Sequence, residues 1–163
     1  MGLGTDLHRL VEGRRLIIGH VSIEHDRGPD AHSDGDVLLH ALIDALAGAA
    51  GLPDIGEMFP DTDPAYRGAD SGVLLAEALR RVERAGFAVV NADATVHVQQ
   101  PRLGPYKTAI RAEVARLLGL PVEAVSIKAK TGEGVDAVGR CEAIGCTAVV
   151  GLCWREPRAI SQE

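Results

Sequence analysis

The sequence predicts an α/β sandwich, in which a mixed β-sheet is covered by helices on one face. Two patterns carry this prediction: apolar residues alternate with polar ones in some segments, as in half-buried strands, and recur every three or four residues in others, as in helices. The chain has 163 residues, 46% hydrophobic and 25% charged, which suits one globular unit with its own core. We expect a single domain over residues 1–154 and a polar tail over 155–163.

Strands are predicted near both ends of the chain. Residues 3–10 and 16–23 are expected to pair as a hairpin, because the turn-forming Gly13 lies between them. Further strands are expected at 87–98, 125–129 and 143–154.

Helices are predicted between these strands. Residues 34–50 carry apolar side chains at helical spacing, and Gly51 follows as a stop signal. Two further amphipathic helices are expected at 71–85 and 106–118, each followed by glycine. The long irregular segment 52–70 between the first two helices is of the kind that often carries function.

Composition excludes several classes of protein. The chain has 17 Lys and Arg against 23 Asp and Glu, a net charge of −6, which argues against nucleic-acid binding. No apolar run approaches the length of about 18 residues that a membrane helix needs, so no membrane partner is expected. Cys141, Cys146 and Cys153 lack the spacing of disulfide or zinc motifs, and we expect buried, reduced thiols in a cytoplasmic protein.

Asp6 and His8 are candidate metal ligands. They lie two residues apart in a predicted strand, so both side chains leave the same face. A solvated strand face explains such a pair equally well, and a metal site needs a third ligand. The candidates for that ligand are His20, His25, His32, His40 and His97.

His40 stands out because it lies in an otherwise apolar helix. A buried core histidine is the common explanation for such a residue. Asp36 and Asp44, four residues to either side, are candidates to orient its imidazole. An Asp/His/His set would leave one position of a tetrahedral zinc ion open, as in catalytic sites.

Two segments have the chemistry of phosphate binding. His32 and Ser33 precede a predicted helix N-terminus, which favours either an anion or simple helix capping. Residues 128–134 combine lysines, a threonine, glycines and Glu133, which together can hold phosphate and a divalent ion.

Taken in order along the chain, these residues form a characteristic set of motifs. They are Asp6-Leu7-His8, the string AHSDGD at 31–36 followed by His40, Asp54-Ile55-Gly56, and the string FPDTDP at 59–64. On these motifs the chain resembles the 2-C-methyl-D-erythritol 2,4-cyclodiphosphate synthase family of the non-mevalonate isoprenoid pathway, over about residues 4–152.

The resemblance implies a lyase reaction. The 2-phosphate of 4-diphosphocytidyl-2-C-methyl-D-erythritol 2-phosphate would attack the β-phosphate of the same molecule, release CMP and close 2-C-methyl-D-erythritol 2,4-cyclodiphosphate. The resemblance also implies a cytoplasmic homotrimer with active sites between subunits.

The resemblance further assigns roles to residues. Asp6, His8 and His40 match ligands of Zn²⁺ or Mn²⁺, and Glu133 matches the ligand of Mg²⁺ or Mn²⁺ bridging the diphosphate. His32 and Thr131 match the catalytic residues. Substrate contacts are implied at Asp6, His8, His32, Ser33, Asp54, Gly56, Phe59, Pro60, Asp61, Thr62, Asp63, Val98, Gln99, Gln100, Pro101, Arg102, Leu103, Gly104, Ala129, Lys130, Thr131, Gly132, Glu133, Ala137 and Arg140. Ala137 departs from the family, in which phenylalanine often lines the central cavity of the trimer.

Two other functions remain open on the sequence alone. His25-Asp26 is compatible with a divalent-metal phosphohydrolase of the HD type, although such enzymes are helical bundles. A trimeric binding module with a structural zinc ion would need a fourth protein ligand and no affinity for nucleotides.

Overall fold

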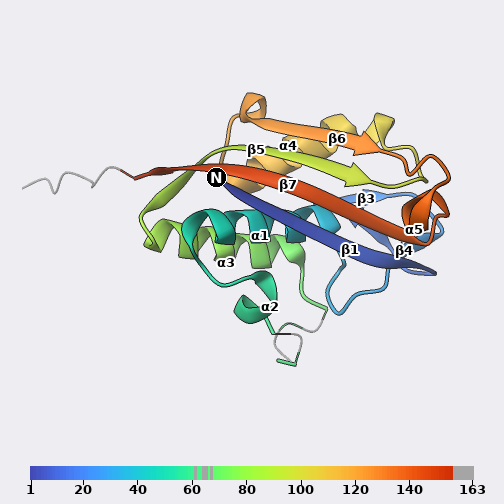
Figure 1. Cartoon of the computed structure of the whole chain (residues 1–163), viewed down its shortest axis with the longest axis horizontal. Coiled ribbons are helices and arrows are strands. Elements are labelled where there is room, and N and C mark those ends of the chain that lie inside the picture. The colour runs from blue at the N-terminus through green and yellow to red at the C-terminus, as the bar shows by residue number, and fades with distance from the viewer. Residues whose placement is uncertain (61, 64–65, 67, 156–163) are drawn as a thin grey trace, which may run out of the picture.

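A mixed five-stranded β-sheet organises the structure, with helices α1 and α3 on one side of it (Figure 1). The strand order is β4-β1-β7-β5-β6, and only β5 and β6 run parallel. The strands are β1 (Gly2–Glu12), β4 (Arg27–Pro29), β5 (Phe87–His97), β6 (Val125–Lys130) and β7 (Ala143–Trp154). The predicted mixed sheet with helices on one face is confirmed.

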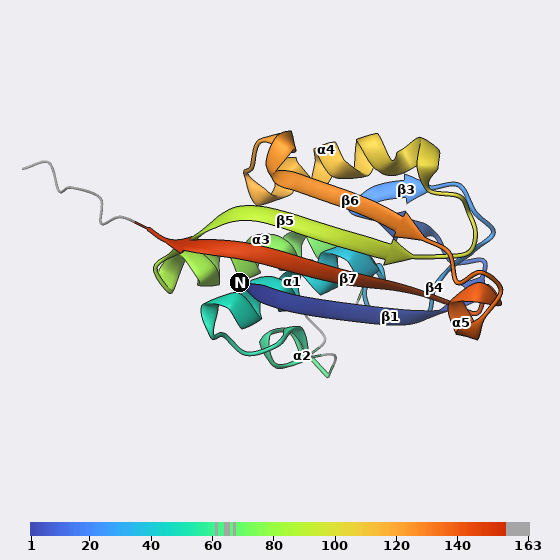
Figure 2. The same ribbon diagram turned by 45° about the horizontal axis from the view of Figure 1, so that its top comes forward.

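The helices follow the predicted ranges closely. The three long ones are α1 (Val37–Ala50), α3 (Ser71–Arg84) and α4 (Lys107–Leu118), which connects β5 to β6 (Figure 2). Short turns of helix are α2 (Ile55–Met58), α5 (Asp136–Gly139), η2 (Gly104–Tyr106) and η3 (Val122–Ala124). None of the helices in the described part of the chain is long and apolar enough to cross a membrane.

This computed structural model describes residues 1–60, 62–63, 66 and 68–155. Asp61 and nearly all of the predicted tail 155–163 lie outside the described residues. The division into a domain of residues 1–154 and a tail therefore stays a prediction.

The predicted hairpin between residues 3–10 and 16–23 is wrong. Strand β1 pairs instead with β4 and β7, while residues 16–23 form a hairpin of their own from β2 (Leu16–Ile18) and β3 (Val21–Ile23). Gly19 and His20 connect these two strands with positive φ angles of 59° and 64°. Positive φ at both residues of a two-residue loop is the geometry that matches the twist of a tight hairpin.

The prediction that all three cysteines are buried is wrong for two of them. All three thiols are free, but only Cys146 is buried, while Cys141 is half-buried and Cys153 is exposed. Cys153 lies near the end of β7, on the same face of the strand as the exposed Val149 and opposite the buried Val150. Burial raises the pKa of the Cys146 thiol to about 12, so this thiol stays protonated and unreactive.

Helix α1 packs directly onto β1 because two glycines make room for it. A Cβ added at Gly4 would lie 2.0 Å from the carbonyl oxygen of Ala41, and one added at Gly2 would lie 2.0 Å from that of Ala45. Gly2 and Gly4 share their face of β1 with Asp6 and His8, since side chains alternate along a strand. The same close approach therefore brings α1 over both candidate ligands.

Gly4→Ala should lower the free energy of unfolding by about 1–3 kcal/mol or more, because the methyl group must displace the backbone of α1. Gly48→Ala is the matched control: Gly48 lies in α1 with open space around its Cβ position, and alanine should stabilise the helix by about 0.5–1 kcal/mol. Urea unfolding of both variants measures the difference. Equal stability of the two variants would contradict the close packing of α1 on β1.

Candidate functional site

Among the residues that the structure describes, one group of side chains is arranged to hold a metal ion. It consists of Asp6, His8 and His40, whose ligand atoms lie within 4.8 Å of one another. The Oδ2 atom of Asp6 lies 3.1 Å from Nε2 of His8 and 3.0 Å from Nδ1 of His40. Nε2 of His8 lies 3.4 Å from Nδ1 of His40. The predicted pair on the strand and the predicted helix histidine do meet, and one carboxylate and two imidazoles suit a divalent transition metal.

The electrostatics of this cluster favour a cation. Burial alone would raise the pKa of Asp6, but hydrogen bonds with His40 and His8 outweigh it and hold that pKa well below its usual range. Burial would likewise lower the pKa of His40, yet its bond to Asp6 raises that pKa above the ordinary value. The cluster therefore keeps an ionised carboxylate facing the ring nitrogens, and a bound metal would replace a proton between them.

The prediction that Asp36 or Asp44 orients the ring of His40 is wrong. The carboxylate of Asp36 is fully buried and accepts hydrogen bonds from the backbone N–H groups of Gly19, His20, Leu38 and Leu39. It thus caps α1 and anchors the β2–β3 turn, and burial raises its pKa to about 6. Asp44 accepts a hydrogen bond of 2.8 Å from the N–H of Ile55 and fixes the next loop to α1.

A pocket of about 380 Å³ opens beside the cluster. Several predicted site residues line it, and four lining residues were absent from the predicted set. The predicted ones are Asp6, His8, His32, Ser33, His40, Gly56 and Phe59, and the additional ones are Ala31, Ile55, Tyr66 and Leu74. Ile55 lies inside the Asp54-Ile55-Gly56 motif, whereas no local pattern marked Tyr66 or Leu74.

Only part of the loop that follows α1 lines this pocket. The carboxylate of Asp54 accepts a hydrogen bond of 2.9 Å from the N–H of Glu57 and caps α2, so it holds the turn that presents Gly56. The ring of Phe59 packs edge-on against Tyr66 at 5.4 Å. Pro60, Thr62 and Asp63 are not among the residues that line the pocket.

A second group of predicted residues gathers at the end of β6. The N–H of Val98 donates to the carbonyl of Lys130 at 2.9 Å, and the N–H of Gly132 donates to the side chain of Gln99 at 3.2 Å. The hydroxyl of Thr131 donates to the carboxylate of Glu133. The segments 98–104 and 129–133 are thus neighbours, as their predicted common role requires.

This second group does not reach the metal cluster within one chain. Asp6 pairs with Cys146 of β7, Cys146 with Val96 of β5, and Val96 with Ala129 of β6. Three strand spacings separate Asp6 from Ala129, about 14 Å in all. Cys146 and Val96 between them are buried core residues, so packed side chains of two strands separate the two groups on this face of the sheet.

The remaining histidines lie outside the cluster. The nitrogens of His20 face Glu113 and Asp70 at 3.1 Å each. The hydrogen bond that His20 donates to the Asp70 carboxylate is the main cause that raises the pKa of His20. His25 lies 3.4 Å from Asp26, and His97 lies on β5.

Ala137 and Arg140 lie in and just after α5, apart from the pocket lining. Arg140 pairs with Glu142 at 3.1 Å on the surface. Both residues lie outside the lining of the pocket beside the cluster, so their predicted contact with substrate stays a prediction.

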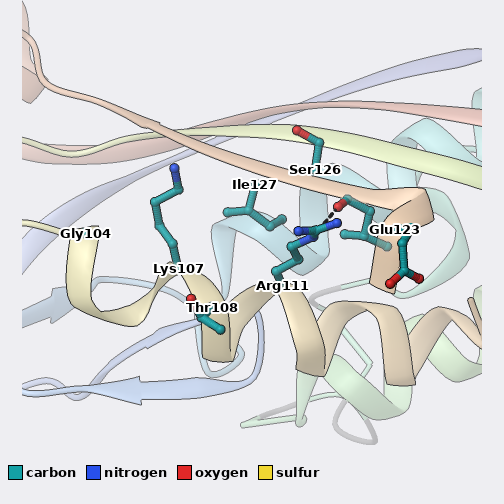
Figure 3. Close-up of a pocket in the computed structure, with 8 residues that line it drawn as sticks. Gly104, Lys107, Thr108, Arg111, Glu123, Ser126 and Ile127 are labelled. Atoms are coloured by element: carbon teal, nitrogen blue, oxygen red, sulfur yellow. Dashed lines mark hydrogen bonds between the residues drawn. The ribbon is translucent and has the colours of Figure 1, made fainter. Parts of the chain in front are cut away.

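A larger hollow of about 500 Å³ lies between α4 and β6 (Figure 3). Lys107, Thr108 and Arg111 of α4 line it together with Ser126 and Ile127 of β6, and the side chain of Ile127 points toward α4 whereas that of Ser126 points away from it. Nε of Arg111 donates to the carbonyls of Val125 and Val122 at 2.7 and 2.9 Å, so it covers the free edge of the sheet. Because this hollow contains no histidine and no paired ligands, the smaller pocket is the candidate site.

The family model of the YgbB family matches residues 1–153, and the chain belongs to that family. The 2-C-methyl-D-erythritol 2,4-cyclodiphosphate synthase of Bordetella avium (strain 197N) is 58% identical to it over 152 residues, which are 93% of this chain and 94% of that protein. The resemblance predicted from the motifs is therefore confirmed.

Solved structures agree with this assignment. A 2C-methyl-D-erythritol-2,4-cyclodiphosphate synthase in its CDP-bound form is similar with a TM-score of 0.87 and 43% identity, covering 93% of this chain and 99% of that one. The bifunctional IspDF from Campylobacter jejuni is similar with a TM-score of 0.91 and 41% identity. The match covers 95% of this chain and 42% of that longer protein.

Proposed function

We propose that this protein is a 2-C-methyl-D-erythritol 2,4-cyclodiphosphate synthase, a lyase of isoprenoid biosynthesis. The observation that carries the proposal is the convergence of Asp6, His8 and His40 in a pocket lined by the AHSDGD loop and the Asp54-Ile55-Gly56 turn. The full-length similarity to proteins of that name supports it.

The reaction is an intramolecular phosphoryl transfer. An oxygen of the substrate's 2-phosphate forms a bond to the β-phosphorus, and the bond from that phosphorus to the leaving CMP breaks. No water is consumed. Such a reaction depends mainly on positioning and on stabilising negative charge at the phosphoryl oxygens.

Asp6, His8 and His40 would hold Zn²⁺ or Mn²⁺, since the three ligands leave one position open for a phosphate oxygen. A metal ion so held polarises the phosphoryl group that it contacts. His32 and Ser33 line the same pocket and would hold the attacking phosphate, with His32 stabilising the developing charge. Gly56 and Phe59, with the turn capped by Asp54, would hold the methylerythritol part.

The nucleotide would be bound by the second group of residues. Backbone groups of 98–104 and 129–131 would hold the cytidine, which is consistent with the scarcity of aromatic side chains for stacking on the base. Glu133 would bind Mg²⁺ or Mn²⁺ against the diphosphate, and Thr131 would stabilise the transition state. The structural relative in its CDP-bound form supports a cytidine nucleotide as part of the substrate.

We propose that the two groups come together between subunits of a homotrimer. The buried strands between Asp6 and Ala129 prevent one chain from completing the site, whereas a neighbouring copy can supply the nucleotide half. The sheet face opposite α1 supports such an assembly, because Leu3 and Leu7 on it are 64% and 65% exposed and exposed apolar groups of this kind favour a covering partner. In a closed ring of three copies, the same head-to-tail interface occurs three times, so each interface would complete one site.

We expect the enzyme to work in the cytoplasm, without a nucleic-acid or membrane partner. No observation on the described residues favours a phosphohydrolase, since His25 and Asp26 lie outside the pocket lining. A purely structural zinc site is disfavoured as well, because the cluster offers three ligands and opens into a pocket.

Incubation of the purified protein with 4-diphosphocytidyl-2-C-methyl-D-erythritol 2-phosphate and Mg²⁺ should release CMP and the cyclic diphosphate in equal amounts, as followed by ³¹P NMR. In ¹⁸O-labelled water neither product should carry label, because no water enters the reaction. Inorganic phosphate or labelled product would identify a hydrolase and refute the proposal. His25→Ala serves as a control that should retain activity, whereas His40→Ala should lose nearly all of it.

The proposed site between subunits can be tested by mixing two inactive variants. His40→Ala damages the metal half of the site and Glu133→Gln the nucleotide half. When the two are dissociated together and reassembled in equal amounts, about a quarter of the junctions should combine two intact halves, so about a quarter of the activity should return. Sites contained in single chains would give no recovery, and each variant reassembled alone provides the control.

A further inference from the structure

We infer that Asp34 and Ser71 act as positioning residues for the metal site, by fixing which nitrogen of His40 faces the metal. The inference rests on the metal-binding part of the proposed function, but not on the reaction. Ser71 is the first residue of α3 and is fully buried, and its hydroxyl oxygen lies 2.9 Å from Nε2 of His40.

The direction of this hydrogen bond follows from a count of hydrogens. A serine hydroxyl has one hydrogen to donate, and that of Ser71 is directed to Oδ1 of Asp34. Toward His40 the Ser71 oxygen can therefore only accept. Nε2 of His40 must carry the hydrogen of this bond, which leaves Nδ1 to face Asp6 and His8 with its lone pair once a metal is bound.

Ser33 is compatible with the same arrangement. Its hydroxyl oxygen lies 3.2 Å from Nε2 of His40 and accepts a hydrogen bond of 3.1 Å from the N–H of Gly35. If Nε2 carried a lone pair, it would face the lone pair of the Ser71 oxygen at 2.9 Å, which is repulsive. With the hydrogen on Nε2, the Ser71 oxygen accepts it, and the hydrogen of Ser33 stays available for an anion in the pocket.

Asp34 itself is held firmly in place. Its Oδ2 accepts a hydrogen bond of 3.0 Å from the N–H of Ser71, and its own N–H donates to the carbonyl of Ala69 at 3.2 Å. The N–H of Gly68 donates to the carbonyl of His32 at 2.8 Å. These bonds join the AHSDGD loop to the start of α3, so Asp34, Ser71 and His40 form one connected chain of contacts that ends at the metal cluster.

The test compares Ser71→Ala, Asp34→Asn and the double variant. Groups that orient a metal-bound histidine typically contribute 10–100-fold in metal affinity, so we expect Ser71→Ala to weaken Zn²⁺ binding by about 10-fold or more in a chelator competition. Asp34→Asn should also weaken it. Because Asp34 acts through Ser71, the effect of Asp34→Asn should largely vanish in the Ser71→Ala background.

Asp70→Asn is the matched control. It changes the charge in the same way one residue before Ser71, and asparagine caps helices as well as aspartate, but Asp70 contacts His20 and not His40. Its zinc affinity should equal that of the unchanged protein. Thermal unfolding of all variants shows that each one folds.

A spectroscopic signature separates positioning from mere structural support. In ¹⁵N-histidine NMR of the zinc-loaded protein, His40 should bind through Nδ1, and its Nε2–H should exchange slowly with water because it is bonded to Ser71. In Ser71→Ala that hydrogen should exchange much faster, whereas in Asp70→Asn it should not. Zinc bound through Nε2, fast exchange in the unchanged protein, or additive effects of the two substitutions would overturn the inference while leaving the proposed function intact. If the unchanged protein bound no zinc, both the metal site and this inference would be wrong.

Discussion

The close packing of α1 on β1 is the constraint on which the rest of the site depends. Gly2 and Gly4 let the helix backbone approach the strand where any other side chain would collide with it. Asp6 and His8, two and four residues beyond Gly4 on the same face, then lie within hydrogen-bonding distance of His40 of α1. The positions of the metal-cluster side chains are thus set by the close contact between the α1 backbone and the glycines of β1.

Helix α1 also organises what surrounds the cluster. At its N-terminus Asp36 ties the helix to the β2–β3 turn, and on the next turn of the helix after His40, Asp44 holds the N–H of Ile55. The loops that line the pocket are therefore anchored to the same helix that supplies a ligand. This rigidity suits a reaction whose rate depends on positioning rather than on proton transfer.

Several of the carboxylates that make the chain acidic have structural or metal-binding roles. A net charge of −6 is unexpected in a protein proposed to handle phosphates, but several carboxylates have internal tasks. Asp6 belongs to the metal cluster, Asp36 and Asp54 cap helices, and Asp34 is bonded to Ser71. Bound cations would supply the positive field that phosphates need.

Much of the fold and part of the site could be predicted from the sequence. The helical spacing of 37–46 and the alternation of β1 are local patterns, and the Asp6–His8 pair follows from the period of a strand. The partner of β1 could not be predicted, because the turn at Gly19 and His20 lies inside a segment that resembles one strand. The Asp34–Ser71 contact joins residues 37 positions apart, and a pattern of neighbouring residues cannot predict a contact between segments so far apart in the sequence. Within the nucleotide half of the site, the chemistry of residues 128–134 marked a phosphate-binding segment, whereas segment 98–104 was found only through the family resemblance.

We propose that the packing of α1 on β1 creates a metal site from Asp6, His8 and His40. Anomalous diffraction at the zinc absorption edge, from crystals of the protein loaded with Zn²⁺, would locate the ion in this site. We expect one strong peak per chain, about 2.0–2.2 Å from a carboxylate oxygen of Asp6, Nε2 of His8 and Nδ1 of His40. A peak at other residues, or one bound to only two of these three side chains, would contradict it.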